Sequence, residues 1–392
     1  MKQLIDNKGI PASLIFSMAI LAGITVANIY YNQPLLELIR ADLRCTEVES
    51  NLVSVITQVG YAFGLCMVVP MGDLYSRRRI ISVCMLSSAV LAVIIALSSS
   101  IYMVWAASFF LGICSVVPQL FMPMTAQYSK PADKSKNMGY VLSGLLIGIL
   151  AARVVSGIVG DWLGWRAMFF IVAIVMLPCW IWALSIMPET LRNFHGTYQA
   201  LMRSLVDIVR THPLIRLYSI RGGFAFGSML AVWSCMAFHL SEAPFYAGSD
   251  AVGMLGLCGI VGALTASGVG KWVPRLGIRR ISFVGAIIQI VGWVVAAVFG
   301  YTYPGLIATV ILVDIGLQCQ QISNQSGCMQ DAPHASSRAN TIFMTTYFVG
   351  GSLGTFLAGL GWQLVGWQGV CAVGIALAVV SLLISLIVRR GE

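Results

Sequence analysis

Long apolar segments separated by short polar ones run along the whole chain. Each segment is continuously apolar over 19 to 27 residues and does not alternate with period two, which favours membrane-crossing helices over strands. We predict twelve spans, at roughly 12–36, 48–71, 80–98, 101–127, 137–160, 167–187, 215–241, 250–270, 281–300, 302–328, 339–362 and 367–388. The pattern therefore predicts an all-α integral membrane protein with twelve transmembrane helices.

The two halves of the chain repeat each other. The polar segment 72–80 follows the second span, and 270–281 follows the eighth; each begins with glycine and carries several arginines. Segments 156–166 and 358–368 also match, at a constant offset of 202 residues. A duplicated six-span unit is typical of secondary transporters, which bind the substrate between the halves. We predict two pseudo-symmetric six-helix bundles, at 1–187 and 215–392, joined by a linker at 188–214.

The linker carries an amphipathic pattern. Leu201, Leu205 and Ile208 fall on one helical face, and Arg203 and Asp207 fall on the other. A helix of this kind lies in the plane of a membrane interface rather than across the bilayer. We therefore expect an interfacial helix on the cytoplasmic side that tethers the two bundles.

Composition and charge distribution support a membrane location. Apolar residues make up 58% of the 392 residues and charged residues 10%, against about 25% in soluble domains. The net charge of +9 raises the possibility of nucleic-acid binding, but the charge is distributed unevenly across the membrane. If both termini lie on one side, 19 of the 24 Lys and Arg lie in segments on that side, and only Arg40, Arg44 and Arg166 lie in loops on the other. This asymmetry follows the positive-inside rule and predicts cytoplasmic termini. We expect a monomer in the bacterial inner membrane, with the lipid bilayer and a small-molecule substrate as partners and no nucleic acid.

Motifs for other chemistry are absent from the sequence. The ten cysteines occur singly, without a CxxC or His-rich cluster, so neither a metal site nor a disulfide framework is indicated. The chain has no GxxxxGK[ST] loop for ATP and no HExxH or Ser/His/Asp arrangement. The first span has no small-residue cleavage site, which indicates an anchor rather than a signal peptide. We expect no enzymatic activity and no cofactor, with the proton gradient as the energy source.

Small residues recur at about four-residue spacing in two corresponding spans. They are Gly144, Gly148, Ala152 and Gly157 in span five, and Gly350, Gly354 and Gly359 in span eleven. Small residues let helix backbones approach closely in a membrane. The pattern predicts tight static packing, and a pivot between the bundles is the alternative.

These features together resemble the major facilitator superfamily, specifically its twelve-span drug:proton antiporter branch. The loop motif of the superfamily, Gly-x-Leu-Ala-Asp-Arg-x-Gly-Arg-Arg, is matched at Asp73, Arg77 and Arg78, and the second-half copy keeps Arg275 and Arg279. The resemblance covers essentially the whole chain and implies the major facilitator fold. It also implies that these five residues gate the transporter as a cytoplasmic charge latch that stabilises the outward-open state.

Three charged residues within the spans need a partner or a function. Asp314 in span ten is the one carboxylate near mid-membrane, where burial of an ionised group costs about 2.5–3.5 kcal/mol on insertion scales. We predict that Asp314 couples transport to protons, with a structural hydrogen bond as the alternative. The antiporter branch has a span-five motif, Gly-x-x-x-Gly-Pro-x-x-Gly-Gly, and Arg153 stands at the position of its proline. For Arg153 we predict a substrate contact, a coupling role or half of a gating pair. Arg221 in span seven either contacts the substrate or extends back to the interface.

The resemblance places the cavity between spans one, four, seven and ten. The substrate-binding candidates there are the polar and aromatic side chains Asn28, Tyr31, Gln33, Gln119, Trp233, Gln318, Gln321 and Asn324, together with Arg153 and Arg221. The helical spacing of Gln318, Gln321 and Asn324 predicts a polar face shared with Asp314. Hydrogen bonds between helices, worth about 0.6 kcal/mol on average, are the alternative for each residue.

These expectations define the functional hypothesis. The sequence predicts a secondary active transporter that works by alternating access and exports small amphipathic molecules, drug-like or metabolic, in exchange for protons. A transporter of an anionic metabolite, sugar or nucleoside is the nearest alternative. A transport-inactive receptor or sensor on the same fold is the alternative from another functional class.

Overall fold

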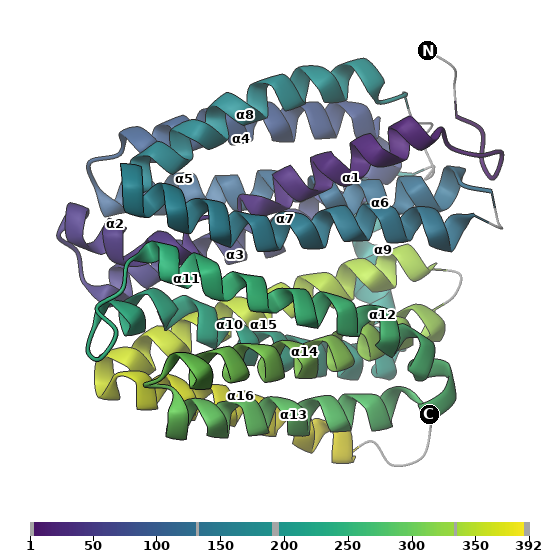
Figure 1. Ribbon diagram of the computed structural model, residues 1–392. Helices are drawn as coiled ribbons and strands as arrows, with labels where there is room; N and C mark the ends of the chain where they lie inside the picture. The colour runs from purple at the N-terminus through teal and green to yellow at the C-terminus, as the bar shows by residue number, and fades with distance from the viewer. Residues whose placement is uncertain (1–3, 131–132, 190–195, 333–334, 388–392) are drawn as a thin grey trace.

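The computed structural model describes residues 4–130, 133–189, 196–332 and 335–387, which form helices and loops without a strand (Figure 1). The first eight α-helices are α1 (Ala12–Ala27), α2 (Leu36–Leu43), α3 (Glu47–Leu74), α4 (Arg77–Leu97), α5 (Ile101–Cys114), α6 (Val117–Tyr128), α7 (Lys134–Leu163) and α8 (Trp165–Ile186), with the 3-10 helix η1 (Gln33–Leu35) between α1 and α2. After α9 (Tyr198–Thr211) come α10 (Pro213–Ser241), α11 (Ser249–Leu255), η2 (Gly256–Cys258), α12 (Gly259–Leu276), α13 (Ile278–Phe299), α14 (Tyr303–Asp331), α15 (Ser336–Val365) and α16 (Trp367–Ile387).

The helices form two layers with roughly parallel axes (Figure 1). Helices α1–α8 make one layer, which we call the N-terminal bundle, and α10–α16 make the other, the C-terminal bundle. Successive long helices run in opposite directions, so α1 begins and α16 ends at the same end of the molecule. We call this end the terminal end, and the opposite one, where α2 lies, the far end.

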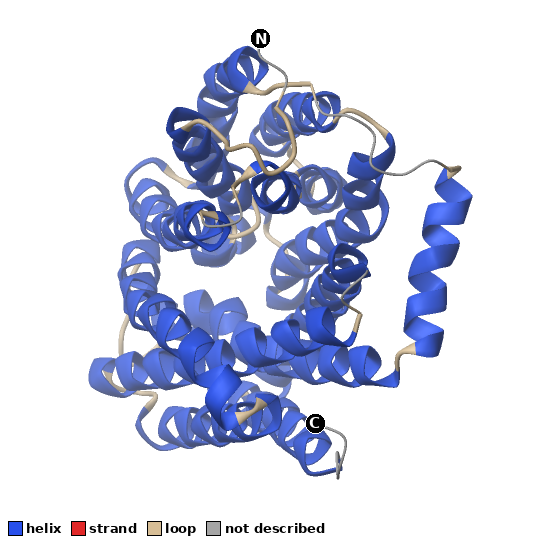
Figure 2. Ribbon diagram, turned by 90° about the vertical axis from the view of Figure 1, so that its right-hand side faces the viewer, coloured by secondary structure: helices blue, strands red, loops and turns tan. Residues whose placement is uncertain are grey.

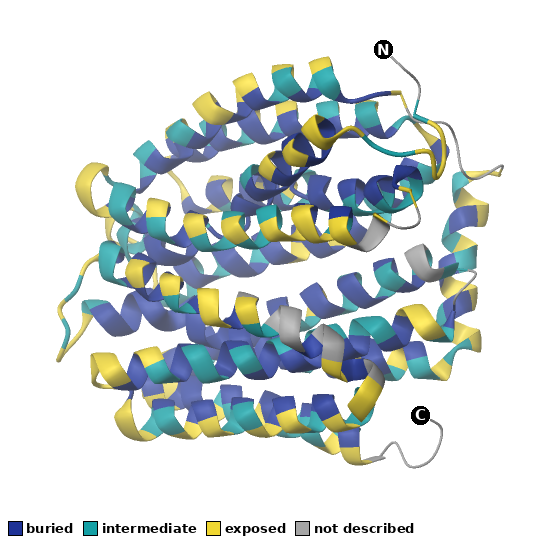
Figure 3. Cartoon of the chain, turned by 45° about the vertical axis from the view of Figure 1, so that its right-hand side comes forward, coloured by how far each residue is buried: buried dark blue, intermediate teal, exposed yellow. Residues whose placement is uncertain are grey.

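Ten helices within the described residues are long and apolar enough to cross a membrane, and two shorter apolar helices, Ala12–Ala27 and Ser249–Gly262, accompany them. Outward-facing apolar residues recur every seven positions. Val83, Val90 and Leu97 on α4 are 64%, 54% and 67% exposed, and Val291 and Val298 repeat the pattern on α13. Figure 3 shows exposed residues along the outer helices. Exposed apolar stripes of this length are suited to contact with lipid.

Three predicted spans are interrupted. The span predicted at 12–36 ends as an α-helix at Ala27 and continues through η1, whose Pro34 occupies the first helical turn. The predicted fourth span divides between α5 and α6, where Pro118 lies in the first turn of the second segment, a position that proline favours. The predicted eighth span divides into α11, η2 and α12. Each predicted span is predominantly apolar on both sides of its break, so hydropathy alone did not indicate where the helices end.

Most of the small residues pack inside a bundle. A Cβ on Gly144 or Gly148 of α7 would collide with the backbone of α1, at Ala19 and Gly23. The same seam recurs in the C-terminal bundle, where Gly350 and Gly354 of α15 contact Gly223 and Gly227 of α10. This placement matches the static-packing interpretation of these residues and the repeat between the halves.

The last glycine of each stripe lies between the bundles instead. A Cβ on Gly157 of α7 would meet the backbone of Ser249 on α11, and one on Gly359 of α15 would meet Asn51 of α3. Side chains are excluded from both positions because the opposite bundle approaches closely. One stripe therefore contributes both to the inside of a bundle and to the contact between bundles.

Helix α9 lies at the terminal end and runs between the bundles at one side, as Figures 1 and 2 show. Leu201, Leu205 and Ile208 are buried, and the Tyr198 hydroxyl donates a hydrogen bond of 3.1 Å to the Met67 carbonyl on α3. The helix also contacts α10 and α15. Residues 190–195 of the predicted linker lie outside the described residues.

Candidate functional site: a cavity between the bundles

A cavity of about 160 Å³ lies between the two bundles. Helices α1, α3, α6 and α7 line it from the N-terminal bundle, and α10, α12, α14 and α15 line it from the C-terminal bundle. The lining within the described residues includes two charged side chains, Arg153 and Asp314, of opposite sign. The cavity thus holds both a potential anion partner and a potential proton acceptor.

Arg153 is positioned by three neighbours. Its Nε donates a hydrogen bond of 2.9 Å to Gln33 Oε1, and its guanidinium carbon lies 4.1 Å from the ring centroid of Trp233 and 5.1 Å from that of Tyr30. The side chain is buried, and Nη2 has no hydrogen-bond partner among the described residues. The aromatic rings offer cation–π stabilisation but accept none of the N–H groups in the usual way.

Asp314 lies on α14, opposite the beginning of α12. A Cβ on Gly259 would stand 3.4 Å from its Oδ2, and one on Gly262 would stand 3.0 Å from its Cβ. The side chain is 7% exposed, and within the described part of the chain no hydrogen bond or ion pair involves it. The glycines leave space beside a carboxylate that lines the cavity, and the structural hydrogen bond considered as an alternative is not seen among the described residues.

Glutamines form the polar part of the lining. Gln119 donates to the Tyr61 hydroxyl over 3.4 Å, and Gln321 accepts from the Tyr347 hydroxyl over 2.9 Å. Gln318 lines the cavity as well. Three of the predicted substrate-binding glutamines are thus brought together at the cavity.

Gln325 also lines the cavity, although we did not predict it. It lies seven residues after Gln318 and four after Gln321, so the same helical periodicity could have identified it. Several aromatic or apolar lining residues were not predicted either, namely Tyr30, Tyr61, Phe226, Met229, Tyr347 and Phe348. Aromatic residues make up 10% of the chain and occur in most of the predicted spans, so composition alone does not distinguish these.

The aromatic lining residues form a continuous group. The rings of Phe226 and Tyr347 are stacked, with centroids 3.9 Å apart and planes at 13°. Tyr61 contacts Phe348 across the bundle boundary at 4.4 Å. Rings with hydroxyl and amide groups at their edges suit an amphipathic molecule, because an apolar body and a polar group are both accommodated.

Arg221 and Asn324 do not line the cavity. Both are 0% exposed inside the C-terminal bundle, where Arg221 Nε donates to Asn324 Oδ1 at 2.6 Å and Nη1 donates to Ser385 Oγ at 3.5 Å. Their placement favours a structural role between α10, α14 and α16 over substrate contact. The snorkelling alternative for Arg221 does not apply either, since the side chain is fully enclosed.

The remaining predicted residues in span one and in span seven lie around the cavity rather than along it. Gln33 and Trp233 are buried, and both contact Arg153, which lines the cavity. Asn28 is buried, with neither amide atom hydrogen-bonded in the described structure, and Tyr31 is half-buried. None of the four is in the cavity lining within the described residues. We therefore regard Gln33 and Trp233 as positioning residues for Arg153.

Among the described residues, four hydrogen bonds join the bundles toward the far end. Asn51 Nδ2 donates to the Thr355 carbonyl at 3.0 Å, and the Thr355 hydroxyl donates to Gln58 Oε1 at 3.2 Å. The Trp362 indole donates to Glu47 Oε2 at 2.8 Å. The fourth bond runs from the Ser249 hydroxyl to the Gly157 carbonyl, at 3.0 Å. Together with the close glycine contacts, these bonds close the cavity on that side.

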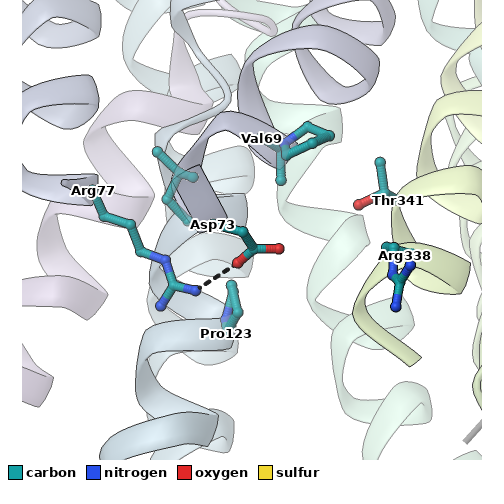
Figure 4. Close-up of a pocket in the computed structure, with 8 residues that line it drawn as sticks. Val69, Asp73, Arg77, Pro123, Arg338 and Thr341 are labelled. Atoms are coloured by element: carbon teal, nitrogen blue, oxygen red, sulfur yellow. Dashed lines mark hydrogen bonds and ion pairs between the residues drawn. The ribbon is translucent and has the colours of Figure 1, made fainter. Parts of the chain in front are cut away.

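The predicted gating residues lie at the terminal end. Arg77 Nη2 pairs with Asp73 Oδ1 at 3.1 Å within the N-terminal bundle. In Figure 4, Asp73 also faces Arg338 and Thr341 of α15 across a small cavity of about 10 Å³. Arg338 was not among the predicted gating residues. The segment that carries Asp73 and Arg77 thus adjoins the boundary between the bundles.

The other arginines of the two loop motifs have different surroundings. Arg78 donates to the Leu184 carbonyl at 2.6 Å and pairs with Glu189 at 3.5 Å, so it holds the start of the linker against the N-terminal bundle. Arg279 donates to the Ser385 carbonyl at 2.9 Å inside the C-terminal bundle, and Arg275 is exposed. A latch role for these three stays a prediction.

A family model described as Major Facilitator Superfamily matches residues 18–355. The chain belongs to this superfamily. The putative uncharacterized transporter YgaY of Escherichia coli K12 is 32% identical over 382 residues, covering 96% of both chains. The probable transporter SCO4007 of Streptomyces coelicolor is 29% identical, covering 91% of this chain and 83% of that protein. The protein is thus a multi-pass membrane transporter of the major facilitator kind and not an enzyme, as the sequence predicted.

Solved structures share the fold. The nucleoside transporter NupG aligns with a TM-score of 0.73 at 13% identity, covering 95% of this chain and 98% of that one. A bacterial homologue of the human lysosomal transporter Spinster, in an inward-facing and unoccupied conformation, aligns with a TM-score of 0.72 at 14% identity, covering 96% and 95%. At this level of identity the likeness concerns the fold alone.

Proposed function

We propose that this member of the superfamily is a proton-coupled secondary transporter of small amphipathic molecules, with the cavity between its bundles as the binding site. The observation that carries the proposal is the lining of that cavity, which combines an unpartnered carboxylate with an aromatic group and glutamines. Among the described residues Asp314 makes no hydrogen bond or ion pair, although the charge of Arg153 acts on it, so its carboxylate is able to exchange a proton as the cavity opens to either side. Such intramembrane acids are typical of proton relays.

Orientation and direction complete the proposal. With the terminal end in the cytoplasm, as the positive-inside pattern predicts, the bonds at the far end close the protein to the outside. The conformation is then inward-facing, in the inner membrane of a bacterium, with the protein working as a monomer. Export is the direction that the antiporter resemblance implies, and the geometry of the cavity bears on substrate and coupling rather than on direction.

Transport by proteoliposomes under an imposed pH gradient tests this function. We expect uptake or release of an amphipathic substrate to depend on the gradient in the natural protein. Asp314→Asn is expected to abolish gradient-driven accumulation while exchange of substrate continues, because the binding site persists but no proton is carried. Asp207→Asn, which removes an exposed carboxylate from α9, serves as the matched control. Accumulation that survives in Asp314→Asn would show that another group carries the proton.

A second candidate is transport of an anionic metabolite, and Arg153 is the observation that favours it. A buried guanidinium within the cavity suits a carboxylate or phosphate better than a neutral solute. Running the same assay with organic anions and with lipophilic cations separates the candidates. Movement of neither class under any gradient would favour a receptor over a transporter.

A further inference from the structure

We propose that Arg153 is the anion receptor of the cavity, so that the transported amphipathic molecule carries a carboxylate or a similar oxyanion. This inference rests on the proposed function, and it specifies the substrate class of the same site. It depends on the side chain of Arg153, which is charged and buried and has only part of its hydrogen-bonding capacity satisfied.

The first step is the charge balance around Arg153. A guanidinium is protonated at any physiological pH, and its burial in the middle of a membrane requires compensation by an acid, carbonyl groups, water or a ligand. Among the described residues, no carboxylate lies within 4.0 Å of Arg153, and Gln33 supplies its one hydrogen bond. Nη2 is buried without an acceptor. Asp314 of the same cavity acts on Arg153 through its charge, but it makes no ion pair with the guanidinium, so an oxyanion bound in the cavity would be its direct partner.

The second step is the orientation of the group. Gln33 holds Nε at 2.9 Å, and the faces of Trp233 and Tyr30 lie against the guanidinium plane. Gly256 lies against the aliphatic part, where a Cβ would come within 3.1 Å of Arg153 Cβ. These contacts occupy Nε, the plane and the stem, and they leave the two terminal nitrogens for a ligand. A pair of parallel N–H groups is the arrangement that binds carboxylate and phosphate oxygens.

The third step is the rest of the cavity. The aromatic rings of Phe226, Tyr347 and Phe348 supply an apolar surface, and the glutamines supply neutral hydrogen-bonding groups. Asp314 opposes an anion while it is ionised and does so no longer when it is protonated. A molecule with an acidic group at one end and an apolar body at the other matches this distribution, with its acidic group at Arg153 and Asp314 protonated.

The test uses three probes with the same apolar body, namely 4-phenylbutyrate, 4-phenylbutyramide and 4-phenylbutylamine. Their affinities for the purified natural protein are measured by calorimetry in detergent. We expect the acid to bind at least about tenfold more tightly than the amide, since a charge-assisted hydrogen bond is roughly twice as strong as a neutral one. Equal affinity of acid and amide, preference for the amine, or no binding of the acid would each overturn the proposal without a variant being made.

Variants then assign the preference to one residue. Arg153→Gln is expected to bring the acid-to-amide affinity ratio close to one, and Arg153→Lys to retain part of it, because the charge remains while the paired donors are lost. Gln33→Leu should reduce the ratio by less than Arg153→Gln does. Arg166→Gln is the matched control, since Arg166 also lies over a tryptophan, Trp165, but outside the cavity. A ratio that survives in Arg153→Gln would exclude Arg153 as the receptor.

The outcome is separable from that of the proposed function. Preferential acid binding without flux in proteoliposomes would support the anion receptor and contradict transport of this class. Gradient-driven flux of the amide or amine, without preference for the acid, would support proton-coupled transport and contradict the anion receptor.

Discussion

The hydrogen bonds at the far end make a quantitative prediction about the conformational equilibrium. Asn51 and Trp362 each donate one bond to the opposite bundle. A net contribution of about 0.5–1.5 kcal/mol per bond gives about 1–3 kcal/mol for the pair. The double variant Asn51→Leu/Trp362→Phe should therefore shift the ratio of far-end-open to far-end-closed molecules by about 5- to 150-fold. An open population of about 1% would rise to between about 5% and 60%.

Double electron–electron resonance between spin labels measures this shift. Ala41 on α2 and Leu364 on α15 are exposed at the far end and lie in different bundles, so cysteines there report far-end opening in a background without native cysteines. Labels at Tyr75 and Leu276 report the terminal end, where both residues are about half exposed. We expect longer far-end distances and shorter terminal-end distances to become populated in the double variant.

The matched control is Trp105→Phe. The Trp105 indole donates a bond of 3.0 Å to the Glu49 carbonyl, so it makes the same kind of contact near the far end but within one bundle. Its removal should leave both distance distributions unchanged. Unchanged distributions in the double variant, or an equal shift in Trp105→Phe, would refute the assignment of these bonds as a far-end gate.

Three further predictions concern stability and the placement of charges. Gly148→Leu should destabilise the protein by about 1–3 kcal/mol or more, because the side chain would collide with α1, whereas Gly139→Leu on the same helix enters open space and should have little effect; thermal unfolding of the two compares them directly. Arg221→Met should lower the melting temperature, since it leaves the buried Oδ1 of Asn324 without the Arg221 donor at a cost of about 1–3 kcal/mol, while Asn324 Nδ2 keeps its bond to the Gln320 carbonyl. It should not alter the acid-to-amide affinity ratio; a changed ratio would place Arg221 at the substrate. Glu189→Gln should change unfolding by less than about 1 kcal/mol, because its pair with Arg78 is exposed, and a larger loss would indicate that the linker stabilises the fold.

The apolar pattern was sufficient to predict the fold class, but it could not locate the helix breaks. The segment from Ala12 to Leu36 is predominantly apolar and was predicted as one span, although the polar residues Asn28, Asn32 and Gln33 follow the end of α1 at Ala27. The break between α11 and α12 falls at Gly256, which lies against Arg153. Contacts from distant parts of the chain decide such positions, and a periodic pattern does not contain them.

Span ten shows how much of the site the sequence contained. At 100° per residue, Asp314, Gln318, Gln321 and Gln325 fall within about 60° of one another around the helix axis. Asn324 is about 60° beyond the nearest of them, toward the interior of the C-terminal bundle, so strict use of the helical angle separates it from the cavity. The contact between Arg153 and Trp233 joins the two bundles. It depends on tertiary packing alone, so the helical pattern of a single span could not predict it.

The glycine seams also constrain how the protein can move. Backbone meets backbone at Gly148 and Gly23 in one bundle and at Gly354 and Gly227 in the other, which leaves no side chains that could slide or change rotamer between these helices. Each bundle is therefore stiff along this closely packed pair of helices, and we expect it to tilt as a rigid body. A displacement of the order of an ångström at the substrate is then transmitted over the full length of the helices to both membrane surfaces, without a chain of intermediate rearrangements.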